Sequence, residues 1–185
     1  MKTHWSWSLI VLLGAGLVLF GCSGDGNGQE QPIEDLMPAG GEVSGWDEDT
    51  SMGAPGVESA HTQAEGEELI NGALDPFTDT GKWVAMAIEY YVNGDMTAEL
   101  QMHEMEDAAS CEGIYTYLEG HPEGTPWEQE GPGVGEASRW ADQGPYWLIH
   151  VRKGKYFFSI NFAPGDDASK TPATGFATAV AAGLP

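Results

Sequence analysis

The sequence predicts an α+β domain, in which an antiparallel sheet of about five strands carries two or three packed helices. Three observations predict this class. Apolar and polar residues alternate along Met96–His103, as in a strand with one buried face. A helical pattern follows at once and ends at Gly120. Near the other end of the chain, two aromatic-rich strands are separated by a short glycine turn, which is typical of a β-hairpin.

The N-terminal segment predicts export. Lys2 precedes an apolar run, Leu9–Phe20, which is too short to span a bilayer comfortably. The end of this run resembles the bacterial lipobox, because a leucine lies three residues before Cys22 and a small residue lies just before it. The resemblance implies that residues 1–21 are a lipoprotein signal peptide and that Cys22 is lipidated.

We expect residues 22–36 to be a flexible acidic tether and residues 37–185 to form a single domain. The sequence has 7 Lys and Arg residues and 29 Asp and Glu residues, which gives a formal net charge of −22. This balance argues against nucleic acid or an anionic membrane surface as the partner. The expected location is the cell envelope, with the lipid in the outer membrane and the domain facing the periplasm or the cell surface.

The first predicted elements are a helix and two strands. Residues 64–74 indicate a short helix that Pro76 ends. Residues 83–92 are apolar on both faces apart from Glu89 and predict a central strand, and Met96–His103 predicts its neighbour. A three-residue loop ending at Gly94 would bring two apolar sets together. The first set is Val84, Met86, Ile88 and Tyr90, and the second is Met96, Ala98, Leu100 and Met102.

The next helix begins after Asp107, which can accept a backbone N–H as the N-cap. Its apolar stripe predicts that the Cys111 thiol is buried. Gly113 indicates a close approach of the helix to the sheet. The stripe consists of Ala108, Cys111, Tyr115 and Leu118.

The C-terminal part predicts a short strand at 136–141, a hairpin and a closing helix. A two-residue turn at Lys153-Gly154 would join the hairpin strands 146–151 and 156–162. It would place Trp147, Ile149 and Val151 beside Tyr156, Phe158 and Ile160. Thr171-Pro172 then predicts the start of a helix that continues to Ala182.

With these elements placed, two motifs resemble a family of exported bacterial proteins known only as a domain of unknown function. Glu68-Leu69-Ile70-Asn71-Gly72 is similar to the EYING start of the family's INGGAE run. The family's YDMGSPEDAFGIYS motif is matched in residue type by Met105, Gly113, Ile114 and Tyr115. The pair Gly45-Trp46 and the run 153–156 agree with its flanks, and the match covers most of 37–158. Ala73, Pro76 and Glu112 depart from the pattern. The resemblance implies export and fold kinship, and it brings no activity.

Residue types that could carry chemistry are few and dispersed. His61, His103, His121 and His150 have no metal-ligand spacing, and we expect neither a metal nor a cofactor. A calcium-loop spacing lacks its glycine and its preceding helix, so a solvated acidic loop is the preferred interpretation. That spacing consists of Asp47, Asp49, Ser51 and Glu58. Cys111 is a candidate nucleophile only if folding brings a histidine near it.

The expected function is therefore non-catalytic: binding or accessory work in the envelope, with an unknown protein or ligand as partner. The alternatives are an envelope enzyme that uses Cys111 or carboxylates, and a structural lipoprotein without a ligand. A ligand groove could be lined by aromatic residues, namely Trp127, Trp140, Tyr146, Trp147 and Tyr156. The candidate contacts for an anionic partner are Arg152, Lys153 and Lys155 at the hairpin tip. The alternative interpretation is that these charges keep the aromatic hairpin from pairing with other chains.

Overall fold

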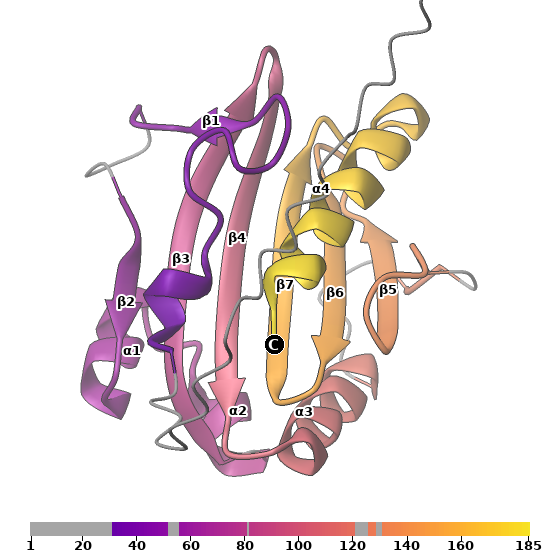
Figure 1. Cartoon of the computed structure of the whole chain (residues 1–185). Helices are drawn as coiled ribbons and strands as arrows, with labels where there is room; N and C mark the ends of the chain where they lie inside the picture. Colours follow the sequence, from indigo (N-terminus) through magenta and orange to yellow (C-terminus); the bar gives the residue numbers. More distant parts are fainter. Residues whose placement is uncertain (1–30, 52–55, 81, 121–125, 129–130) are drawn as a thin grey trace, which may run out of the picture. The chain divides into compact units, whose positions relative to one another are not determined.

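A computed structural model shows a sheet with helices on both faces (Figure 1). It describes residues 31–51, 56–80, 82–120, 126–128 and 131–185. Cys22, the signal segment and His121 lie outside the described residues. The predicted α+β class is confirmed, although the antiparallel sheet has seven strands where the sequence predicted about five.

The strands of the sheet follow the order β1-β3-β4-β7-β6-β5, and β2 pairs with a second stretch of β3. The C-terminal hairpin β6–β7 therefore joins the N-terminal hairpin β3–β4 through β7, so that β4 and β7 form the centre. The strand bounds are β1 Asp47–Glu48, β2 Glu58–Ala60, β3 Trp83–Asn93, β4 Met96–Met105, β5 Ala137–Asp142, β6 Trp147–Lys153 and β7 Tyr156–Ala163.

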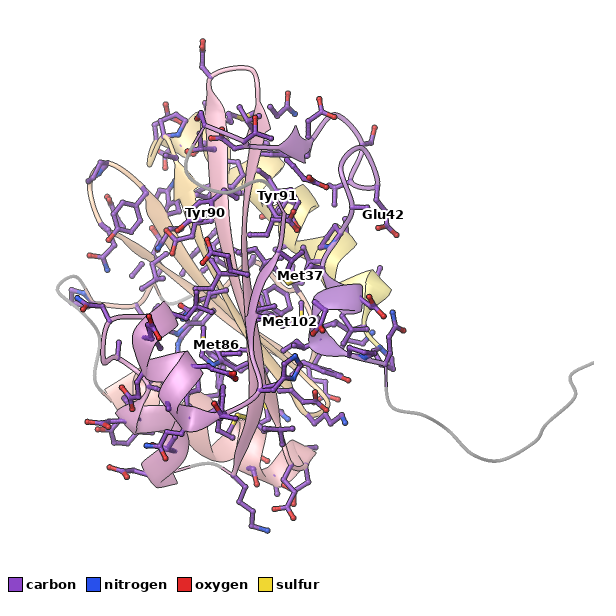
Figure 2. The ribbon with its side chains drawn as sticks, turned by 90° about the vertical axis from the view of Figure 1, so that its left-hand side faces the viewer. Met37, Glu42, Met86, Tyr90, Tyr91 and Met102 are labelled. Carbon is purple, nitrogen blue, oxygen red and sulfur yellow. The ribbon has the colours of Figure 1, made fainter. Side chains whose placement is uncertain are left out.

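Helices lie on opposite sides of this sheet (Figure 1). The 3-10 helix η1 and helix α4 pack on the first face, and α1, α2 and α3 pack on the second. Figure 2 shows Tyr91, Met37 and Met102 on the side of α4, and Tyr90 and Met86 on the opposite side. The bounds are η1 Ile33–Leu36, α1 Gln63–Leu69, α2 Asp75–Thr80, α3 Ala108–Gly120, η2 Asp167–Ser169 and α4 Lys170–Gly183.

The first face is apolar along most of its length and is covered by α4. Leu100, Phe158 and Ile160 come from the two central strands and are fully buried. Trp46 packs edge-on against Phe162 and at a tilt against Phe176, with ring centroids 5.4 and 4.9 Å apart, which joins the N-terminal loop to both the sheet and α4. Residues 31–36, which composition assigned to the tether, belong to the compact unit, because Ile33 and Leu36 are buried in this core.

The second core lies beneath α1, α2 and α3 and is smaller. Cys111 is fully buried there, as its helical position predicted. Asp107 caps α3, because its Oδ1 accepts the Ser110 N–H at 2.7 Å. The predicted stripe needs one correction: Ala108 is exposed, and Ile114 occupies the buried position instead. Gly113 approaches Thr80 O at the end of α2 and not the sheet.

The predicted helix at 64–74 ends early: α1 covers Gln63–Leu69, and residues 70–74 form a turn before α2. Thr62 and Glu65 form a capping box that starts α1. The chain then turns through Asn71 and Gly72, whose φ angles are 52° and 83°. Pro76 lies in the first turn of α2, where its missing N–H leaves no hydrogen bond unmade. The proline therefore begins a helix that the sequence analysis did not predict.

The predicted register of β3 and β4 is wrong. The turn consists of Gly94 and Asp95, and Gly94 has φ 62°. Ala87 lies opposite Met102, and Tyr91 lies opposite Ala98. Consequently Met86, Ile88 and Tyr90 share a face with His103, Gln101 and Glu99. Because β3 is largely apolar on both faces, its pattern does not distinguish one register from the other. In the register observed, the polar residues of β4 lie beside apolar residues of β3.

The C-terminal elements differ in smaller ways. The hairpin turn is Gly154-Lys155, one residue later than predicted, so each predicted pair shifts while the predicted faces are kept. Val151 now lies opposite Phe158. Helix α4 begins at Lys170, directly after η2, and its N-cap is Ser169, which makes no side-chain capping bond. Asp166 caps η2, because its Oδ1 accepts the Ser169 N–H at 2.9 Å. Thr171 is therefore not the N-cap.

Glu89 is a buried carboxyl group on the apolar first face, with 3% of its surface exposed. Tyr91 Oη lies 2.9 Å from Pro38 O and 2.6 Å from Glu89 Oε2. One hydroxyl proton cannot serve both oxygens, and the Pro38 carbonyl can only accept. Both contacts are hydrogen bonds when Glu89 is protonated and donates to Tyr91. Burial, together with the charge of Glu48, raises the pKa of Glu89 against an opposing contribution from Tyr91.

This arrangement predicts stability that is lost as pH rises. The folded-state pKa of Glu89 lies above its ordinary value of 4.5, so its contribution is complete below that pH and disappears as pH passes the raised pKa. Glu89→Gln should match the wild type near pH 4 and exceed its free energy of unfolding near pH 8 by on the order of 1 kcal/mol. Urea unfolding at both pH values measures this. Exposed Glu112→Gln controls for removing one negative charge, and an equal gain from it would contradict the prediction.

Candidate functional site

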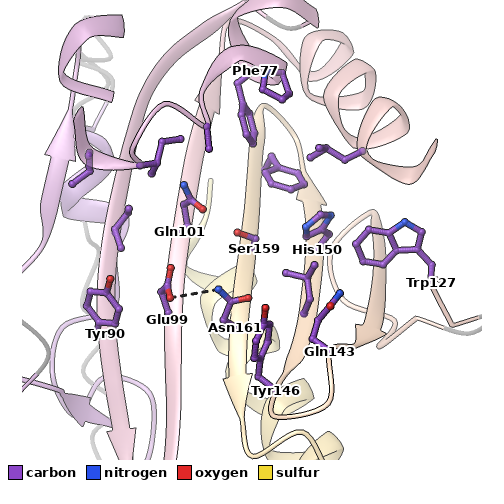
Figure 3. A pocket seen from close by; sticks show the side chains of 18 residues that line it. Phe77, Tyr90, Glu99, Gln101, Trp127, Gln143, Tyr146, His150, Ser159 and Asn161 are labelled. Carbon is purple, nitrogen blue, oxygen red and sulfur yellow. Dashed lines mark hydrogen bonds between the residues drawn. The ribbon is translucent and has the colours of Figure 1, made fainter. Parts of the chain in front are cut away.

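Two cross-strand rows on the second face of the sheet form the floor of a groove (Figure 3). The first row is Tyr90, Glu99, Asn161 and Leu148, and the second is Ile88, Gln101, Ser159 and His150. The four polar residues on the central strands β4 and β7 are half-buried. Helices α1, α2 and α3 cover the rows beyond them but leave this part open, and the hollow measures about 380 Å³.

The walls of the groove come from several elements. Leu69, Ile70 and Phe77 line it from the α1–α2 segment, and Leu118 from α3. Trp127 contributes an aromatic wall. Between β5 and β6, Gln143 and Tyr146 form the remaining side.

A second cavity of about 390 Å³ adjoins the first one. The two share Tyr90, Glu99, Tyr146 and Asn161, and the second extends to Asp49. The combined hollow therefore extends along β4 and β7, from Gln101 and Ser159 to Thr97 and Ala163, and Glu99 lies where the two cavities meet.

Glu99 is the acidic residue that lines both cavities. Asn161 Nδ2 donates to its Oε2 over a long 3.4 Å, and no cationic side chain of the described residues pairs with it (Figure 3). Burial raises the pKa of Tyr90, and the charges of Glu99 and Glu58 raise it further. Tyr90 therefore keeps its hydroxyl proton, in a field that disfavours negative charge.

Arg139 lies next to the groove on β5 but is enclosed by aromatic rings. Its guanidinium carbon lies 4.1 Å from the ring centre of Tyr115 and 4.4 Å from that of Trp127. Arg139 Nη2 donates to Tyr115 O at 2.8 Å and lies 3.3 Å from His150 Nδ1. Its Nε and Nη1 are buried without a hydrogen-bond partner, and Glu119 Oε2 lies 3.9 Å from Nη1. Stacking thus accommodates a desolvated positive charge.

His150 lines the groove as a neutral imidazole. Burial, followed by the charges of Arg139 and His103, lowers the pKa of His150 to about 3. Because the arginine can only donate, Nδ1 of the neutral ring is the acceptor and Nε2 carries the proton. No described group accepts a hydrogen bond from Nε2.

His103 is fully buried and does not line the groove. Its ring stacks on Phe77 at 3.7 Å, and its Nδ1 accepts from Trp83 Nε1 at 3.2 Å. Burial lowers the pKa of His103 to about 3. It is a packed core residue that supports the Phe77 wall.

The candidate residues at the hairpin tip have intramolecular partners. Arg152 Nη1 lies 2.8 Å from Glu136 Oε2, and Lys155 Nζ lies 2.5 Å from Glu104 Oε1. Lys153 Nζ donates to Ala181 O and Leu184 O at 2.8 and 2.5 Å, at the end of α4. Each cation thus has a role within the fold, and docking of an anionic partner there stays a prediction.

Cys111 lines neither of the two cavities described above, and burial raises the pKa of its thiol to about 12. The predicted aromatic set divides between the two faces of the sheet. Trp127 and Tyr146 line the groove. Trp147 and Tyr156 are buried in the first-face core, against which Trp140 packs.

The sequence analysis missed the residues that make the floor. Glu99 and Gln101 alternate with the apolar residues of a strand that was predicted to be covered on one face, and no role was predicted for Ser159 and Asn161. Their signal was the recurrence of polar residues at every second position in both strands. It becomes informative only once β4 and β7 are known to be neighbours.

The neutral state of His150 predicts acid sensitivity. Below pH 6.5 the unfolded chain takes up a proton that the folded ring resists until about pH 3, so stability falls as pH drops through this window. His150→Gln should flatten the slope of unfolding free energy against pH, by an amount that approaches about 1.4 kcal/mol per unit as pH falls from 6.5 to about 5. Ser159→Ala, a non-titrating change beside it, should move the whole curve without changing its slope. Parallel curves for the wild type and His150→Gln would refute the assignment.

In the described part of the chain, no group of three or more His, Cys, Asp or Glu side chains is arranged to hold a metal ion. No helix among the same residues has the length and apolarity needed to cross a membrane. In the comparisons with known proteins, no family model, no curated protein and no solved structure matched the chain.

Proposed function

We propose that this protein is a lipid-anchored binding protein of the cell envelope that holds a small polar molecule in the groove on the second face. The observation that carries the proposal is the polar floor in the centre of the sheet. A central position is normally covered, and here four half-buried polar side chains line a hollow of about 380 Å³. Ligand sites are commonly hollows of this size, with a few polar groups among apolar walls.

The groove distinguishes this proposal from the two alternatives. A structural role does not account for the hollow walled by Phe77, Trp127 and Tyr146, because exposed apolar surface of this kind is typical of binding sites. For an enzyme that uses Cys111, the thiol would have to reach the groove as a thiolate, and its burial and raised pKa oppose both. No hydrogen bond joins Ser159 to His150 among the described residues, so these two side chains do not form a nucleophile–base pair.

The anchor rests on the N-terminal sequence. Cys22 alone follows the apolar run at the cleavage position. A Cys22→Ala protein should lose the lipid and leave the membrane fraction, which fractionation and intact mass measure together. Unchanged membrane retention and unchanged mass would contradict the anchor and leave the groove untouched.

Binding in the groove is tested by filling it. Ser159→Trp places a large side chain on the floor, whereas Thr178→Trp adds the same side chain on the exposed side of α4. The full chain and both variants are purified from the native envelope, and the small molecules released on denaturation are compared by mass spectrometry. A compound should accompany the wild type and Thr178→Trp and be absent from Ser159→Trp.

Circular dichroism is the control for whether both variants are folded. If Ser159→Trp unfolds, Gln101→Leu replaces it, because it removes a polar floor group with little change in volume. The same compounds at the same yield from the wild type and from a folded floor variant would refute the proposed site.

A further inference from the structure

We propose, on the basis of the function above, that the ligand of the groove is a hydroxyl-rich amine of the amino-sugar class. Its ammonium group would pair with Glu99, and its hydroxyl groups would meet the amides and His150. Four features of the groove support this assignment: its charge, the hydrogen-bonding groups of its floor, the free donor on His150 and its aromatic walls.

The charge of the groove calls for a cation. Glu99 lies where the two cavities meet, and Asp49 lies in the second cavity. Neither cavity is lined by Lys or Arg, and the nearby charge of Arg139 is enclosed by Tyr115 and Trp127. A half-buried carboxylate with only one long hydrogen bond gains most from a ligand that brings a positive charge and several N–H donors.

The remaining polar lining suits hydroxyl groups. Gln101, Gln143 and Asn161 each present a donor and an acceptor, and Ser159 presents a hydroxyl. Hydroxyl groups also donate and accept at one atom, so a ligand with several of them can satisfy this mixed set. A simple alkylamine would offer no hydrogen-bond partner to Gln101 and Ser159, at a cost for each group desolvated.

His150 supplies an independent observation. It is more than nine-tenths buried, lines the groove, and has a proton on Nε2 that no described group accepts (Figure 3). Nε2 is not among the described buried atoms that lack a partner, so it is open to the groove, where an acceptor oxygen of the ligand can meet it. Glu99 and His150 lie in adjacent rows on strands separated by β7, which allows one ligand to meet both.

The aromatic walls support the same class. Tyr90 is the direct cross-strand neighbour of Glu99, and Tyr146 lines both cavities beside it. Their rings offer apolar faces to the C–H faces of a sugar ring and electron-rich faces to an ammonium group.

The experiment uses three hexose probes that differ in charge: glucosamine, glucose and glucuronate. The full chain in detergent is titrated near pH 6, where the amine is protonated, and binding is followed by ¹H–¹⁵N spectra. Glucosamine should bind about tenfold more tightly than glucose, with glucuronate weakest, because one ion pair in a partly desolvated site contributes about that factor. Perturbed signals should belong to groove residues. Added salt should reduce the preference for glucosamine.

Glu99→Gln keeps the shape of the floor and removes its charge, so glucosamine should fall to the affinity of glucose while glucose is unchanged. Glu112→Gln, on the exposed side of α3, is the matched control and should retain the preference. Equal binding of the three sugars, or binding of none, would overturn the amine assignment. The proposed function then still stands if the compound that co-purifies with the wild type perturbs groove residues, and it fails as well if that compound does not.

Discussion

The pairing of β4 with β7 is the constraint on which the rest of the structure depends. It joins two hairpins far apart in the chain and runs from Thr97 opposite Ala163 to Glu104 opposite Tyr156. Because side chains alternate, this register sends Leu100, Ile160 and their neighbours to one face and the polar residues to the other. The first face becomes a continuous core under α4, and the second acquires a polar centre that no helix covers.

The charged groups of the protein differ in how much solvent surrounds them. The chain carries a formal net charge of −22, and the cations of the β6–β7 hairpin are engaged inside the fold with Glu136, Glu104 and the end of α4. Surface carboxylates attract cations generally, but salt and water screen them. Glu99 differs from them because the groove walls partly exclude solvent around it. Buried ionisable groups elsewhere are accommodated differently: Glu89 through a proton, and Arg139 through two aromatic rings.

The sequence predicted what local patterns determine. The strands at the two hairpins, the Asp107 cap and the burial of Cys111 follow from spacing within a few residues, and all are present. The β3–β4 register was missed because β3 is largely apolar on both faces and tolerates either alignment. The groove was missed for a different reason: its floor is assembled from Glu99, Gln101, Ser159 and Asn161, whose adjacency depends on a long-range pairing that no local pattern encodes. Of the predicted aromatic lining, only Trp127 and Tyr146 line the groove. The others belong to the first face, because successive side chains along a strand point to opposite faces.

The long-range pairing also has a kinetic consequence. Glu99 and Asn161 are 62 residues apart, yet they are direct neighbours in the sheet centre. Until β7 has emerged, β4 has β3 on one side and an open edge on the other, with Leu100 and Met102 uncovered by α4. Such non-local closure is slow, because the entropy of a long loop is lost before the contacts form. A chain that cannot complete its core until its C-terminal hairpin arrives stays unfolded through most of its synthesis, and the export proposed above would require that state.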